Sequence, residues 1–144
     1  MFRQIAALPV QFADDGSLRL YLVTSRGGGR WIIPKGNPIP GLAPHEVAAQ
    51  EAFEEAGLVG KVMPVCVGTF EFDRTRRIEG SKCLIDVYPM FVEKQLNKFD
   101  EQRQRRVLRC DLKTALSMVT SQPLAALIER YGRHSGSIIR AVGR

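Results

Sequence analysis

Stretches in which hydrophobic and polar residues alternate, together with short hydrophobic runs, predict β-strands in several parts of the chain. Residues 2–11 and 18–25 are the first two, and the turn sequence DDGS separates them. Residues 31–33 (WII) form a short strand that ends at Pro34. Further strands are expected at residues 61–72, 82–93 and 104–110.

Helical patterns are less frequent than strand patterns. One helix is expected over residues 44–56, with proline in its first turn and Gly57 as its C-terminal stop. The glycine- and proline-rich residues 36–42 before it read as a loop. Two closing helices are expected over DLKTALSMV and PLAALIERYG. Mixed strands with few helices predict an α/β (α+β) sandwich.

The length and composition are those of one compact domain. The chain has 144 residues, of which 44% are hydrophobic and 25% are charged, enough for one core and too few for two. We therefore expect a single domain over residues 1–144, and the sequence leaves open whether the tail after about residue 133 is ordered. No hydrophobic run approaches the roughly 18 residues of a membrane span, and residues 1–12 lack the design of a secretion signal.

The cysteines indicate the redox compartment of the protein, and the net charge indicates the kind of partner. Cys66, Cys83 and Cys110 lie far apart without a C-x-x-C spacing, so we expect three buried thiols in the reducing cytoplasm rather than disulfides or a zinc site. The net charge of +6 predicts an anionic partner. On charge alone, nucleic acid, a phosphorylated small molecule and a membrane surface all stay open.

The helix expected at residues 44–56 gathers carboxylates near its C-terminal end. At about 100° per residue, Glu51, Glu54 and Glu55 fall on one side. Like charges at these spacings repel by roughly 0.2–0.5 kcal/mol per pair, and the negative end of the helix dipole disfavours acids there. The opposite side, expected to be buried against a sheet, consists of Ala48, Ala49, Ala52, Phe53 and Ala56.

Two interpretations of the acidic cluster compete. Solvated acidic faces are common on helices, but no Lys or Arg lies within one turn of these three glutamates to neutralise them. Carboxylate oxygens hold hard divalent cations, and phosphate oxygens often complete the shell. The preceding loop supplies Lys35 as a charge for phosphate and Gly36 as bare backbone. We therefore prefer a metal site.

These residues resemble the signature of the Nudix hydrolases, G-x5-E-x7-R-E-U-x-E-E-x-G-U, in which U is a bulky aliphatic residue. Two positions depart from it, because Leu42 replaces a glutamate and Gln50 replaces the arginine. The missing residues have opposite charges, so their loss affects rate and metal affinity more than reaction type. The matching positions are Gly36, Glu51, Glu54, Glu55, Gly57 and Leu58, with Ala52 as a small stand-in for U.

The segment TSRGGGRWIIPKG, which leads into this signature, is similar to the diadenosine and diphosphoinositol polyphosphate phosphohydrolases. Ser25, Arg26, Arg30, Trp31 and Pro34 carry the likeness. The resemblance implies a Nudix-type α/β/α sandwich in which helices flank a mixed β-sheet. It also implies a Mg²⁺- or Mn²⁺-dependent hydrolase that cleaves a phosphoanhydride bond of a nucleoside or inositol polyphosphate.

The resemblance also assigns roles to the carboxylates. The expected metal ligands are Glu51, Glu55 and the Gly36 carbonyl. Glu54 is a further candidate ligand. Glu54 is expected to be the catalytic base that accepts a proton from the attacking water, with Glu51 as the other catalytic candidate. Glu101 is a reserve ligand or base, unless it is only a solvated loop acid.

The basic residues predict a substrate with several phosphates. If the segment RQRRVLR is extended as a strand, Arg103, Arg105 and Arg109 share one face, although any single arginine also fits a plain surface charge. Trp31 is expected to pack beneath the acidic helix rather than to stack on a base. The expected substrate-binding residues are Arg3, Ser25, Arg26, Arg30, Lys35, Lys82 and Arg105.

Other functions remain as alternatives. We expect a small-molecule polyphosphate as the partner of a monomer or homodimer, and neither a membrane nor nucleic acid. One alternative is a house-cleaning NTP pyrophosphohydrolase. Another is a non-catalytic Nudix domain that binds nucleotide or RNA, favoured by the charge, the basic loop at residues 74–82 and the two departures. Against it, a domain that only binds has no need of three mutually repelling glutamates.

Overall fold

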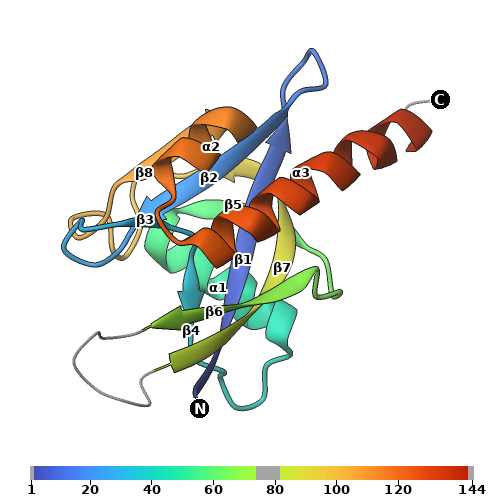
Figure 1. Cartoon of the computed structure of the whole chain (residues 1–144). Coiled ribbons are helices and arrows are strands. Elements are labelled where there is room, and N and C mark those ends of the chain that lie inside the picture. The colour runs from blue at the N-terminus through green and yellow to red at the C-terminus, as the bar shows by residue number, and fades with distance from the viewer. Residues whose placement is uncertain (1, 74–81, 143–144) are drawn as a thin grey trace.

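The computed structural model describes residues 2–73 and 82–142, with the side chains of residue 73 and residues 136–142 excepted. A mixed eight-stranded sheet carries one helix on one face and two on the other (Figure 1). The basic loop expected at residues 74–82 therefore lies outside the described residues, apart from Lys82. The elements in chain order are β1 (Phe2–Phe12), β2 (Leu18–Thr24), β3 (Trp31–Ile32), β4 (Lys35–Gly36), α1 (Pro44–Ala56), β5 (Leu58–Val62), β6 (Gly68–Asp73), β7 (Lys82–Gln95), β8 (Val107–Asp111), α2 (Leu112–Met118) and α3 (Gln122–Val142).

Strand β1 is the centre of the sheet. It runs parallel to β7 from Phe2 opposite Cys83 to Val10 opposite Phe91. On its other edge, β1 pairs antiparallel with β2 only at its C-terminal end, and β4 pairs with it near Ile5. The sheet thus divides on this edge, because β2 diverges to pair with β3 and β8. This division brings the loop that ends at Gly36 against β1.

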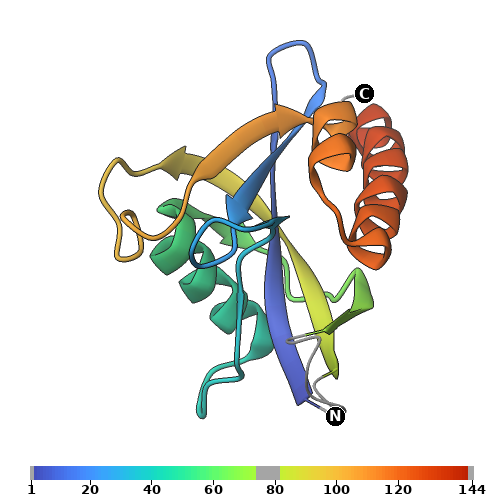
Figure 2. The same cartoon turned by 60° about the vertical axis from the view of Figure 1, so that its left-hand side comes forward.

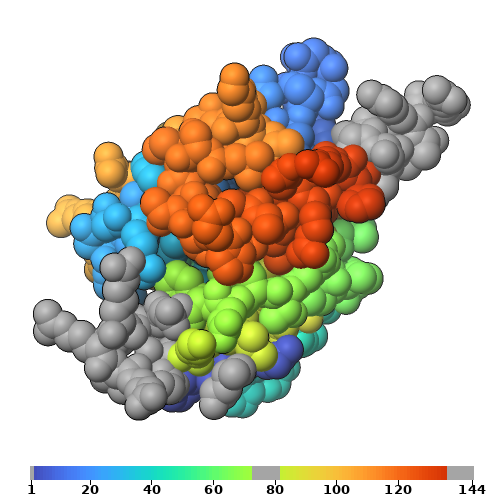
Figure 3. Space-filling view, in the orientation of Figure 1, coloured from blue at the N-terminus to red at the C-terminus, as the bar shows by residue number. Residues whose placement is uncertain are grey.

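Side chains of β1 alternate between two cores, as the pleat of a strand requires. Leu8 and Val10 belong to a core covered by α2 and α3, whereas Ile5 and Ala7 belong to a core covered by α1. Figure 2 shows α1 on one side of the sheet and the two C-terminal helices on the other. In the space-filling view, α2 and α3 form one continuous surface over their face, with β6 beside α3 (Figure 3). The expected α/β/α sandwich is confirmed.

Helix α1 begins and ends where the sequence predicts. Pro44 occupies the first turn, and the Ala43 backbone N–H donates to the Glu46 carboxylate at 2.8 Å. Gly57 closes the helix with a left-handed φ of 67°, and its N–H donates to the carbonyls of Ala52 and Phe53. None of the described helices is both long and apolar enough to cross a membrane.

Several sequence predictions were wrong in detail. The strand expected at residues 61–72 is two strands, β5 and β6, because the chain turns at residues 63–67. Strand β4 was missed, since two residues in a proline-rich loop give no periodic pattern. Strand β8 begins at Val107, so Arg103 and Arg105 precede it and share no strand face with Arg109. The last helix continues through the tail to Val142, and Cys66 is exposed rather than buried.

Candidate functional site

Helix α1 lies against the sheet through small side chains. Ala48, Ala52 and Ala56 are fully buried, as predicted, and they allow α1 to approach β1 and β5 closely. Phe53 was expected on this buried face, but 43% of it is exposed. The close approach carries Glu55 into the interior, where it is only 1% exposed.

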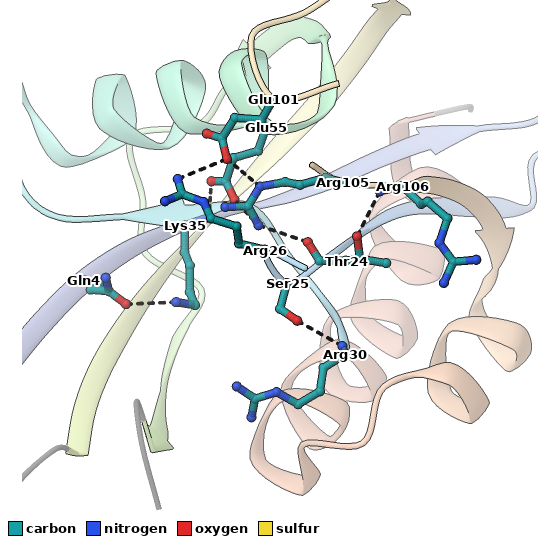
Figure 4. A network of polar contacts seen from close by, with 10 residues as sticks. All are labelled: Gln4, Thr24, Ser25, Arg26, Arg30, Lys35, Glu55, Glu101, Arg105 and Arg106. Atoms are coloured by element: carbon teal, nitrogen blue, oxygen red, sulfur yellow. Dashed lines mark hydrogen bonds and ion pairs between the residues drawn. The ribbon is translucent and has the colours of Figure 1, made fainter. Parts of the chain in front are cut away.

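Glu55 has two partners from distant parts of the chain. The Lys35 backbone N–H donates to its Oε2 at 3.0 Å, and the Arg105 guanidinium lies 3.1 Å from its Oε1 (Figure 4). Burial nevertheless raises the pKa of Glu55 to about 8, because the loss of hydration outweighs the lowering by Arg105. The adjacent Glu51 contributes to this rise through its charge and a shared hydrogen bond.

Glu51 contacts both Glu55 and β4. Its carboxylate fills the space that a Cβ atom at position 36 would occupy, which explains why glycine stands there. Burial raises the pKa of Glu51, a hydrogen bond shared with the Glu55 carboxyl group lowers it, and the charges of Glu54 and Glu101 raise it. Glu51 and Glu55 therefore form a pair of adjoining carboxyl groups that both have raised pKa values.

Glu54 has a hydrogen-bond partner within its own helix. The Gln50 side-chain amide donates to Glu54 Oε1 at 3.0 Å. Gln50 occupies the position at which the Nudix signature has arginine. Glu54 is therefore bound by a neutral amide at this position and not by a cation. The hydrogen bond spans one turn of α1 on its exposed side.

The residues present suit a hard divalent cation in their chemistry. Two adjoining carboxylates with raised pKa values, next to a glycine backbone at position 36, supply the oxygen ligands that Mg²⁺ and Mn²⁺ prefer. Across residues 2–73 and 82–142, no group of three His, Cys, Asp or Glu side chains is already arranged to hold a metal ion. Two of the three glutamates on α1 contact side chains of the protein instead, because Glu54 accepts a hydrogen bond from Gln50 and Glu55 forms an ion pair with Arg105.

The loop between β7 and β8 closes over the end of α1. Leu96 donates its N–H to the Gly57 carbonyl at 2.8 Å, and Glu101 donates its N–H to the Glu54 carbonyl at 3.0 Å. The Glu101 carboxylate accepts from Arg105 Nε at 2.7 Å. The reserve residue Glu101 is thus brought to the acidic pair, although its own position in the sequence is 46 residues beyond Glu55.

Two of the expected substrate-binding cations converge on one aromatic ring. The Lys35 ammonium and the Arg30 guanidinium each lie 4.7 Å from the centroid of Phe72. Lys35 Nζ also donates to the Gln4 side chain at 3.1 Å. Gln4 and Phe72 were missed from the sequence, because alternation in a strand indicates which face a residue occupies but not what approaches that face.

Ser25 and Arg26 lie in the turn between β2 and β3. The Ser25 hydroxyl accepts from the Arg30 backbone N–H at 3.0 Å, which closes the turn. Arg26 is exposed and its guanidinium lies 3.4 Å from Glu101. A pocket of about 570 Å³ separates this turn from the loop before β8, and its lining includes Arg26, Gly27, Gly28, Arg103, Arg105 and Arg106.

The remaining expected substrate-binding residues have other partners. Arg3 makes a two-bonded ion pair with Asp86, at 2.8 and 3.0 Å, and Lys82 lies 3.8 Å from Glu71. Trp31 was expected beneath α1, but it packs against the opposite core, under α2 and α3. The Arg106 guanidinium covers the Trp31 ring at 5.4 Å from its centroid.

Known structures define the class of this fold. The chain superposes on the Ap4A hydrolase of C. elegans, in a binary complex, with a TM-score of 0.77, 15% identity and coverage of 95% of this chain and 99% of that one. The NUDIX domain of Shewanella oneidensis NrtR, complexed with ADP-ribose, gives a TM-score of 0.71 and 16% identity over 93% of this chain and 88% of that one. The fold is therefore the Nudix fold.

A comparison of sequences points to one branch of that class. Residues of this chain are 40% identical to the diphosphoinositol polyphosphate phosphohydrolase 3-beta of Bos taurus over 58 residues, which are 40% of this chain and 35% of that protein. The match thus spans about a third of that relative. No family model matches the sequence. The sequence match to the bovine protein and the structural neighbours together confirm the resemblance to the Nudix hydrolases and to their diadenosine and diphosphoinositol polyphosphate branch.

Proposed function

We propose that this protein is a divalent-metal-dependent hydrolase that cleaves a phosphoanhydride bond of a nucleoside or inositol polyphosphate. The observation that carries the proposal is the double role of Lys35. Its backbone N–H binds Glu55 on the acidic side, while its side chain lies with Arg30 on the Phe72 ring. Groups suited to a metal ion and groups suited to phosphate therefore meet at one residue.

The roles of the residues follow from their chemistry. Glu51, Glu55 and the Gly36 carbonyl would hold Mg²⁺ or Mn²⁺, which when bound supplies charge neutralisation and an activated water. Lys35 and Arg30 would neutralise phosphate oxygens, and Ser25 keeps the turn that carries Arg30 in shape. Glu54 would accept the proton of the attacking water. A diadenosine or diphosphoinositol polyphosphate is the proposed substrate. One structural neighbour is an Ap4A hydrolase, and the relative in the sequence comparison is a diphosphoinositol polyphosphate phosphohydrolase.

A phosphate-release screen tests the proposal. The purified protein is assayed with Mg²⁺ or Mn²⁺ on diadenosine polyphosphates, diphosphoinositol polyphosphates, nucleoside triphosphates and ADP-ribose. Turnover that stops when the metal is chelated is expected for at least one of the first two classes. The absence of metal-dependent turnover on all four would overturn the proposal, and turnover of nucleoside triphosphates alone would favour a house-cleaning pyrophosphohydrolase.

The proposed base has its own test. Glu54→Gln should fold normally and lower kcat by about 10²- to 10⁴-fold, the usual contribution of a general base. Glu46→Gln is the matched control, because it removes the same charge from the first turn of the same helix and keeps an oxygen for the Ala43 N–H. Full activity in Glu54→Gln would show that another group takes the proton, with Glu101 as the next residue to replace.

A second candidate function is nucleotide binding without hydrolysis. It is favoured by the Gln50 contact, which holds Glu54 at 3.0 Å in a signature that lacks its arginine, and by the similarity to a Nudix domain complexed with ADP-ribose. Calorimetry with ADP-ribose and a diadenosine polyphosphate distinguishes the two functions. Micromolar binding without any turnover would establish the binding domain, whereas turnover of the bound ligand would exclude it.

A further inference from the structure

Arg105 is the one cation that enters the acidic site from the loop before β8 among the residues described. Its side chain is only 10% exposed, and three groups surround the guanidinium (Figure 4). Nε donates to Glu101 at 2.7 Å, Nη1 donates to the Thr24 carbonyl at 3.0 Å, and Nη1 lies 3.1 Å from Glu55 Oε1. The charge of Arg105 is thus held next to the most deeply buried carboxylate of α1.

Arg105 lies on the Glu55 oxygen that has no bond to β4. The other oxygen, Oε2, accepts the Lys35 backbone N–H at 3.0 Å. A cation that approaches Oε1 leaves that hydrogen bond unshared, and Oε1 is the oxygen beside the Arg105 guanidinium. Since the guanidinium and a divalent cation repel each other at such short range, the two cannot share this oxygen without cost.

Helix α1 offers Glu55 no cation of its own. The residue one turn and one position before it, Gln50, is neutral and engages Glu54 instead. A buried carboxylate without a partner is strongly destabilising. The loop before β8 therefore supplies what the helix lacks, from a position 50 residues further along the chain.

We propose that Arg105 is the resident counter-ion of Glu55 in the metal-free protein and competes with the divalent cation for Glu55 Oε1. Arg105 then acts as a positioning residue that stabilises the acidic pair and lowers its affinity for metal. The inference rests on the proposed function, because it takes the acidic pair to be the metal site. It assigns Arg105 a role other than the substrate contact expected from the sequence.

Metal affinity measured without substrate tests the competition. Free Mn²⁺ is followed by electron paramagnetic resonance during titration of the wild type, Arg105→Gln, Arg105→Lys and Arg109→Gln. Arg105→Gln should bind Mn²⁺ about tenfold more tightly, because the repulsion between the two cations is removed. Arg105→Lys keeps the charge and should stay near the wild type. Arg109→Gln removes the same charge from β8, where Arg109 contacts Gln11, and should also stay near it.

The direction of the change separates competition from damage. Loss of a merely structural contact would loosen the acidic pair and weaken Mn²⁺ binding, whereas competition predicts tighter binding. Unchanged or weaker binding in Arg105→Gln would overturn the inference, and so would the absence of Mn²⁺ binding in every variant. Failure of the proposed hydrolysis would leave it intact, since no substrate is present in this experiment.

A second measurement covers the case in which Arg105→Gln does not fold. In ¹⁵N-labelled wild-type protein, the Nε–Hε resonance of Arg105 is assigned by its loss in Arg105→Lys and followed during Mg²⁺ titration. It should shift with the same midpoint as metal binding, because the guanidinium gives up Glu55. A resonance that stays unchanged at saturating Mg²⁺ would overturn the inference.

Discussion

Two carboxylate–arginine networks in this protein use the same chemistry in different surroundings. One joins Arg105 to Glu55 and Glu101 at the end of α1, and the other joins Arg3 to Asp86 across β1 and β7. In the first, the Arg105 side chain is 10% exposed and that of Glu55 is 1% exposed. In the second, the Arg3 side chain is 58% exposed and that of Asp86 is 19% exposed.

The pKa values of Glu55 and Asp86 are shifted in opposite directions. At Asp86, burial raises the pKa, but hydrogen bonds from Arg3 and Thr69 outweigh it, and the pKa is lowered overall. At Glu55, burial outweighs Arg105, and the neighbouring Glu51 adds to the rise. Arg3 and Thr69 therefore favour the ionised form of Asp86, whereas Arg105 does not offset the burial of Glu55. Under the proposed function, a divalent cation would take the place of the proton at the buried pair.

The largest expected difference between the networks is in stability. At a pH above the Glu55 pKa of about 8, Arg105→Gln in the metal-free protein leaves the buried Glu55 charge without its cation and should lower the free energy of unfolding by about 3 kcal/mol. Arg3→Gln breaks an exposed pair and should change the urea midpoint little. Urea denaturation with chelator measures both variants. Equal destabilisation by the two changes would show that burial does not distinguish the networks.

The pH dependence of stability should also differ between the networks. The folded protein keeps the Glu55 proton up to a pKa of about 8, whereas the unfolded chain releases it near the ordinary value of 4.5. The folded state binds more protons in this interval, so the stability of the metal-free protein should fall as pH rises through it. At Asp86 the lowered pKa means that stability is lost only as pH falls below its ordinary value of 3.8.

Urea midpoints across this interval check the sign. The fall with rising pH should be much smaller in Glu55→Gln, which has no proton to lose, and should persist in the control Glu46→Gln. Saturating Mg²⁺ should reverse the fall in the wild type, because the cation replaces the proton. A wild-type stability that rises over the same interval would contradict the raised pKa of Glu55.

The smallest change in stability is expected from a substitution of Gly36, the glycine beside the acidic pair. A Cβ at position 36 would meet the Glu51 carboxylate, which is the far end of a flexible side chain and can move. Gly36→Ala should therefore leave thermal stability nearly unchanged while weakening Mn²⁺ binding by about tenfold. Gly16→Ala is unsuitable as a control because of its left-handed φ, so Gly29→Ala serves, where only Ser25 Oγ lies nearby at 3.7 Å. Unchanged Mn²⁺ affinity in Gly36→Ala would remove Glu51 from the ligand set.

Local signals in the sequence were enough to predict several helices and strands. Periodicity, proline in the first turn and the stop at Gly57 defined α1, and alternation defined β1, β2 and β7, because each signal depends only on neighbours in the chain. The clustering of Glu51, Glu54 and Glu55 on one side of a helix is local for the same reason. The signature spacing then indicated the fold class, which the structural neighbours confirm.

The contacts between distant segments, including the pairing of charges, follow from the three-dimensional fold. Arg105 reaches Glu55 because β8 pairs with β2 and the loop before it binds the end of α1. Lys35 reaches Glu55 because β4 pairs with β1. Trp31 faces α2 and α3 because of the register of β3 on β2. These contacts join segments far apart in sequence, and their energies depend on burial, which no local pattern specifies.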